Sequence, residues 1–128
     1  MPKKVSIEEY EDMVIEAAIY KEAVDDFVDL AKLDDVAKML SVFYATTGLA
    51  GEAGEVANKV KKILRDNRGV IDDEIRQKVL GELGGVAWYL TAVSAEFDLS
   101  LTDVLEYNFN QIKDRQERDV LHGDGDNR

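Results

Sequence analysis

A near absence of proline constrains this chain more than any other feature. Its 128 residues include one proline, at position 2, so no later residue lacks a backbone donor or forces a turn. This favours long helices over a turn-rich β architecture. Because 45% of the residues are apolar, the chain can build a modest core, and its length predicts a single domain over residues 1–128.

Start signals and apolar spacing predict four or five helices. A capping box at Ser6–Glu9 opens a helix that we expect to run to about Leu30, and Asp34 or Asp35 can cap a segment beginning near Val36. The further expected helices cover about 45–65, 73–97 and 100–118, and residues 119–128 form a non-helical tail. We therefore predict an all-α fold, a four- to five-helix bundle, with the hypothesis that a second copy completes its core.

Composition limits the function. A net charge of −11 disfavours nucleic-acid binding, and it indicates either plain solubility or carboxylates gathered for a hard cation such as magnesium. The absence of cysteine excludes disulfides and thiolate metal sites and suits a reducing cytoplasm. One histidine, His122, argues against zinc sites and Ser-His-Asp triads. We expect a cytoplasmic protein without a membrane segment, since no signal-peptide pattern or long apolar run is present.

Two carboxylates define the first candidate site. Glu52 and Glu55 fall on one face of the helix over 45–65, and Lys59 and Lys62 continue that face. Two carboxylates on one turn form half of a site for a hard cation, and the lysines can contact phosphates. The alternative is a solvated face with an ion pair between Glu55 and Lys59.

Glu82 makes the second candidate. On the next helix it projects near the middle of the apolar stripe, between the directions of Val79 and Val86. A carboxylate in such a place is costly unless it has a partner, which is either a lysine or arginine or a metal ion. A structural ion pair is the common solution, but a second acidic helix favours a shared cation.

Glycines and aromatic residues surround these carboxylates. The glycines are Gly48, Gly51, Gly54, Gly81, Gly84 and Gly85. Each costs roughly 1 kcal/mol in a helix interior, so their concentration indicates close approach by a ligand or by another helix. Tyr44, Trp88 and Tyr89 can stack on a base or ribose, or belong to a core or an interface.

Three segments, Gly48–Val56, Gly81–Gly84 and Trp88–Leu90, resemble the MazG-like nucleoside triphosphate pyrophosphohydrolases. The similarity extends from about Tyr44 to the C-terminus, where the ending Gly123–Arg128 is similar to that of small phage-encoded or bacterial members. The resemblance implies an all-α homodimer or homotetramer. It also implies hydrolysis of an NTP or dNTP to the monophosphate and pyrophosphate with Mg²⁺ or Mn²⁺.

The resemblance also assigns roles to residues. Glu52, Glu55 and Glu82 would hold metal, and one of them would orient the attacking water. The residues that would contact the nucleotide are Lys59, Lys62, Trp88, Asn108, Arg115, Asn127 and Arg128, with Lys59, Lys62 and Arg115 at the phosphates.

Gly85 departs from the family pattern, which has aspartate there, and Gln111 stands where many members have lysine. Mg²⁺ needs only one or two protein carboxylates, so losing one harms catalysis more than binding. The alternatives are therefore a nucleotide-binding relative with weak or no catalysis, and an acidic helical interaction module with no small ligand.

Overall fold

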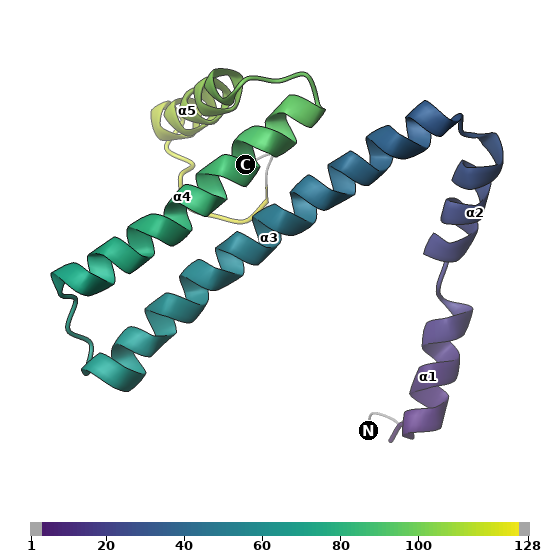
Figure 1. Ribbon diagram of the computed structural model, residues 1–128, viewed down its shortest axis with the longest axis horizontal. Coiled ribbons are helices and arrows are strands. Elements are labelled where there is room, and N and C mark those ends of the chain that lie inside the picture. Colours follow the sequence, from purple (N-terminus) through teal and green to yellow (C-terminus); the bar gives the residue numbers. More distant parts are fainter. Residues whose placement is uncertain (1–3, 126–128) are drawn as a thin grey trace. The chain divides into compact units, whose positions relative to one another are not determined.

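Every regular element in the computed structural model, which describes residues 4–125, is a helix (Figure 1). The helices are α1 (Ile7–Glu16), α2 (Tyr20–Leu30), α3 (Leu33–Asn67), α4 (Asp73–Glu96) and α5 (Leu101–Glu117). The prediction of an all-α fold is confirmed. None of the helices in this described range is long and apolar enough to cross a membrane.

The chain divides into two compact units, residues 1–39 and residues 40–128. The first unit contains α1, α2 and the first turns of α3, and the second contains the rest of α3 with α4 and α5. The single domain over 1–128 stays a prediction. The candidate site lies wholly within the second unit.

In the first unit the predicted capping box is confirmed. The hydroxyl of Ser6 accepts from the backbone N–H of Glu9 at 3.1 Å, and the Glu9 carboxylate accepts from the N–H of Ser6 at 3.0 Å. The prediction of one helix to Leu30 is wrong, because residues 17–19 interrupt the helix and separate α1 from α2. No glycine, proline or side-chain cap marks this break, so the sequence pattern offers no signal for it.

The third helix is longer than predicted. We expected one segment near Val36 and a separate helix over 45–65, but α3 is continuous for 35 residues. Its start is earlier than predicted, because α3 begins at Leu33 and both Asp34 and Asp35 lie in its first turn instead of capping a segment near Val36. The carboxylate of Asp35 accepts from the backbone N–H of Lys32 at 3.0 Å. The glycines within it weaken the helix without interrupting its hydrogen-bond ladder. It ends where Arg68 and Gly69 adopt positive φ angles of 52° and 78°.

In the second unit α3 and α4 form an antiparallel hairpin (Figure 1). The amide of Asn67 donates to the carbonyl of Val70 at 2.7 Å and holds the turn. Either Asp72 or Asp73 could cap α4 on sequence grounds, and the cap is Asp72, because its carboxylate accepts from the N–H of Ile75 at 2.9 Å. The box at Ser100 and Asp103 opens α5, and α5 contacts α4.

The second unit buries little of its apolar surface. Among residues 40–125 the buried side chains are Ala45, Ser94 and Arg115. Apolar side chains of α3 are incompletely covered, since Val60 is 50% and Leu64 is 76% exposed. On α4, Leu83 is 50% exposed. The hairpin therefore presents an apolar surface that its own described residues do not cover.

Candidate functional site

The predicted acidic residues lie along the seam between α3 and α4. Glu52 on α3 and Glu82 on α4 are half-buried, whereas Glu55 is exposed. Their positions follow from helical spacing, which turns Glu52 towards α4 and turns Glu55 away from it by about 60°. The seam therefore contains two carboxylates, one from each helix, with a third beside it.

Glu82 has a lysine partner. The ammonium group of Lys59 lies 3.3 Å from Oε1 of Glu82, and the two side chains are 34% and 23% exposed. This ion pair joins α3 to α4 across the seam. It supplies the partner that the Glu82 carboxylate needs, because burying an unpaired charge among apolar residues is costly. Of the two partners predicted for Glu82, a cationic side chain or a metal ion, the described arrangement contains the first.

Glu52 packs directly over Gly85. A Cβ atom built on Gly85 would lie 2.7 Å from Cδ of Glu52 and closer still to its Oε2. The Glu52 carboxylate thus fills the space that a side chain at position 85 would occupy. The far end of a glutamate is flexible, so an aspartate at this position would require Glu52 to rotate away, not a shift of backbone.

Aromatic residues occupy the seam on the other side of Glu52. The ring of Tyr89 lies against the backbone of Gly48, where any side chain would collide with it. Partial burial raises the pKa of the Tyr89 hydroxyl, and the neighbouring Tyr44 hydroxyl raises it further. The ring of Trp88 meets Tyr89 edge-on, with centroids 4.8 Å apart and planes at 79°.

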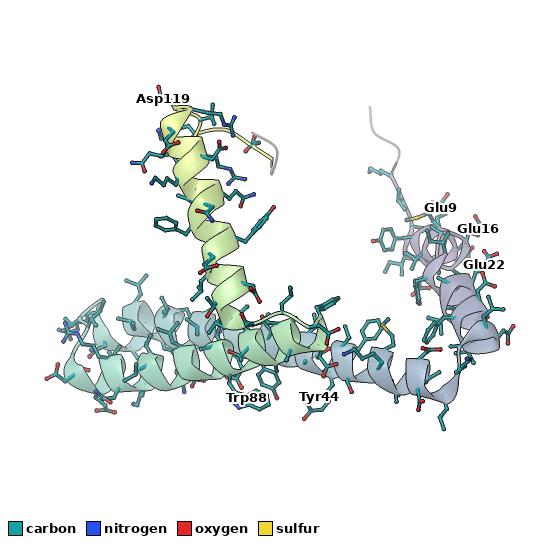
Figure 2. All side chains as sticks on the ribbon, turned by 90° about the horizontal axis from the view of Figure 1, so that it is seen from above. Glu9, Glu16, Glu22, Tyr44, Trp88 and Asp119 are labelled. Carbon is teal, nitrogen blue, oxygen red and sulfur yellow. The ribbon has the colours of Figure 1, made fainter. Side chains whose placement is uncertain are left out.

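Two hollows lie at opposite ends of the seam. One, of about 400 Å³, is bordered by Tyr44, Trp88 and Tyr89, and Figure 2 shows Tyr44 and Trp88 on the side of the hairpin opposite α5. The other, of about 350 Å³, lies near the α3–α4 turn and is lined by Lys59, Lys62 and Lys78 among others. One end of the seam is therefore aromatic, and the other carries three lysines together with the carboxylates of Asp66, Asp72 and Glu74.

Lys78 was not among the residues predicted for the site. It lies one turn before Glu82 on α4, and that i, i+4 spacing is the signal that could have identified it. The exposed carboxylate of Glu74 accepts a hydrogen bond from the ammonium group of Lys78. This bond raises the pKa of Lys78, so the lysine stays charged.

The donor atoms determine whether a metal ion fits. Within residues 4–125, no group of three or more His, Cys, Asp or Glu residues is close enough to hold one. Glu52, Glu55 and Glu82 therefore do not converge in this arrangement. However, Glu52 and Glu82 supply the oxygen ligands that Mg²⁺ prefers, and Mg²⁺ takes only one or two carboxylates. The chemistry of these two side chains suits Mg²⁺, while in the described arrangement Lys59 neutralises Glu82.

The remaining predicted residues lie on α5 or in the tail. Asn108 is exposed and lines a hollow formed by α5 residues, and Arg115 is buried, with 7% exposure. Gln111 is half-buried on the same helix. Asn127 and Arg128 lie outside the described residues. The described structure therefore pairs Lys59 with Glu82 and lines one hollow with Lys59 and Lys62. It places Glu52 over Gly85 and Asn108 in a separate hollow.

No protein-family model and no solved structure matches the chain. The gene 37 protein of Mycobacterium phage L5 is 44% identical to it over 110 residues, which are 86% of this chain and 96% of that protein. The chain belongs to the family of this phage protein. The name of this relative states no activity.

Proposed function

We propose that this protein hydrolyses a nucleoside or deoxynucleoside triphosphate to the monophosphate and pyrophosphate, using Mg²⁺ or Mn²⁺. The observation that supports this most is the meeting of Glu52 and Lys59 of α3 with Gly85 and Glu82 of α4 at one half-buried seam. Carboxylates that suit a hard cation and an ammonium group that suits phosphate are found together there.

The order of residues along the seam supports a nucleotide as the ligand. On α3 the order is Tyr44, Gly48, Glu52 and Lys59, which places Tyr44 and Lys59 about 22 Å apart along the helix at 1.5 Å per residue. On the antiparallel α4 the opposing order is Tyr89, Gly85, Glu82 and Lys78. A base beside Trp88 at the aromatic end would leave the phosphates at the lysine end.

Each residue then has a chemical role. Glu52 and Glu82 hold the metal ion, and Glu55 is the carboxylate left to orient the attacking water. Lys59, Lys62 and Lys78 bind the phosphate oxygens, and Arg115 and the tail residues Asn127 and Arg128 are further nucleotide contacts. The metal ion, when bound, neutralises charge on the phosphoryl oxygens and lowers the pKa of a bound water.

A second candidate function is nucleotide binding with little hydrolysis. The position of Glu52 over Gly85 favours it, because no fourth carboxylate is present and the space for one is filled. The loss of one metal ligand impairs catalysis more than it impairs nucleotide binding, because the other residues of the site still contact the nucleotide.

The uncovered hairpin surface supports a homo-oligomer. At about 100° per residue, Val60 and Leu64 lie on the side of α3 away from Glu55 and Lys62. We infer that a second copy covers this apolar side, which leaves the seam open to a nucleotide, and that homodimers or homotetramers form in this way. A nucleotide substrate and a chain without cysteine are both consistent with the cytoplasm.

Pyrophosphate release tests the proposal. The common NTPs and dNTPs should be assayed with Mg²⁺ and with Mn²⁺ on the wild-type protein, on Glu82→Gln and on Glu106→Gln, an exposed control on α5. We expect release by the wild type and the control and a loss of at least about 100-fold in Glu82→Gln. Binding without release favours the second candidate, and neither binding nor release overturns both.

A further inference from the structure

We propose that Lys59 is a counter-ion that occupies the cation site until a nucleotide binds. This inference rests on the proposed function, because it concerns the same seam. The Nζ atom of Lys59 lies 3.3 Å from Oε1 of Glu82, and neither side chain is more than about a third exposed. A half-buried carboxylate needs a cation beside it, and Lys59 fills that need without a metal ion.

Glu52 occupies a matching position on the other side of the seam. Its carboxylate packs over Gly85, about one turn from Glu82 along α4. Of the two proposed ligands, one is thus neutralised by a lysine and the other is packed against backbone. Mg²⁺ alone would have to separate Lys59 from Glu82 and leave that ammonium group without its carboxylate. We therefore expect Mg²⁺ alone to bind weakly.

A triphosphate removes this obstacle by offering Lys59 another anion. Lys59 also lines the hollow near the α3–α4 turn, together with Lys62 and Lys78. Its ammonium group can therefore move from Glu82 to phosphate oxygens without leaving the site, and this movement frees Glu82. Metal and nucleotide then bind cooperatively, and each raises the affinity of the other by the same factor.

Calorimetry with a charge-removing variant tests this coupling. Mg²⁺ is titrated alone and with the α,β-methylene analogue of whichever nucleotide gives the largest thermal shift. We expect the analogue to tighten Mg²⁺ binding to the wild type by about 5- to 150-fold. Lys59→Gln should bind Mg²⁺ alone about tenfold tighter than the wild type, and it should lose most of the gain from the analogue. A merely structural lysine would give the opposite change, a weaker site.

Two further variants keep the result interpretable. Lys59→Arg retains the charge and should keep the weak affinity for Mg²⁺ alone. Lys61→Gln removes a charge from an exposed position of α3 and should also leave the affinity for Mg²⁺ alone unchanged. Circular dichroism confirms that each variant is helical. A wild-type affinity for Mg²⁺ that does not respond to the analogue overturns the inference, as does a Lys59→Gln variant that binds Mg²⁺ alone no tighter. Either result leaves the proposed function intact if pyrophosphate is released. Failure of every variant to bind metal or analogue overturns both.

Discussion

At the scale of single residues, Gly85 decides how the seam can work. The absence of a side chain there lets the Glu52 carboxylate lie against α4, so one position sets both the packing of the seam and its number of carboxylates. The sequence predicted that a carboxylate was missing from position 85. It did not predict that Glu52 would fill the space, because that contact depends on the register of α3 against α4.

Gly85→Asp should strengthen the metal site. The new carboxylate displaces Glu52 and lies close to it, and two half-buried carboxylates repel each other unless a cation separates them. We expect a lower melting temperature than the wild type without metal and a larger gain on adding Mg²⁺. Metal-dependent pyrophosphate release should rise by about 10- to 100-fold, the range typical of residues that support a metal site.

Gly85→Ala is the matched control for that substitution. It requires the same movement of Glu52 and improves helix propensity, but it adds no charge. We expect no Mg²⁺-specific gain in melting temperature and no increase in pyrophosphate release. If Gly85→Asp responds to Mg²⁺ no more than Gly85→Ala does, position 85 does not face the metal.

At the scale of helices, the sequence predicted the starts better than the breaks. The caps at Ser6, Asp72 and Ser100 depend on residues within three positions of each other, so local side-chain chemistry is enough to locate them. The break after α1 and the continuity of α3 have no such local signal. Packing decides them, and a single sequence does not reveal which elements pack together.

The cap of α5 offers a test with a pH dependence. The Ser100 hydroxyl accepts from the N–H of Asp103 at 3.1 Å, and the Asp103 carboxylate accepts from the Ser100 hydroxyl and N–H, both at 2.7 Å. Both bonds lower the pKa of Asp103 below its ordinary value of 3.8, and the bond from the Ser100 hydroxyl has a larger effect than the bond from the Ser100 N–H. Ser100→Ala should therefore raise that pKa and, as for other lost caps, cost about 1 kcal/mol of stability near pH 7.

The sign of the pH effect follows from the lowered pKa. The ionised Asp103 contributes stability above pH 3.8 and loses this contribution as the pH falls through its lower folded value. The difference between wild type and Ser100→Ala should thus be smaller at pH 3 than at pH 7. Chemical unfolding followed by circular dichroism measures both differences, and equal values at the two pH values would contradict this account of the cap.

At the scale of the whole molecule, the uncovered apolar side of the hairpin predicts self-association. Sedimentation should give a mass of at least twice the 14.3 kDa of one chain. Val60→Lys places a charge on the proposed interface and should shift the protein towards the monomer, because an unpaired charge is costly to bury. Ile71→Lys, at a similarly exposed apolar residue in the α3–α4 turn, is the control that should leave the mass unchanged. A wild-type monomer would refute this interface.

If Glu82 holds the metal ion through which a nucleotide binds at the seam, removing its charge must weaken nucleotide binding. The most direct test is calorimetry of the α,β-methylene nucleotide in Mg²⁺ with the wild type, Glu82→Gln and the control Glu106→Gln. We predict that the wild type and the control bind with Mg²⁺ and lose binding in EDTA. Glu82→Gln should bind at least about tenfold more weakly while its helical spectrum is unchanged. An unchanged affinity in Glu82→Gln would show that Glu82 does not hold a metal ion for the nucleotide.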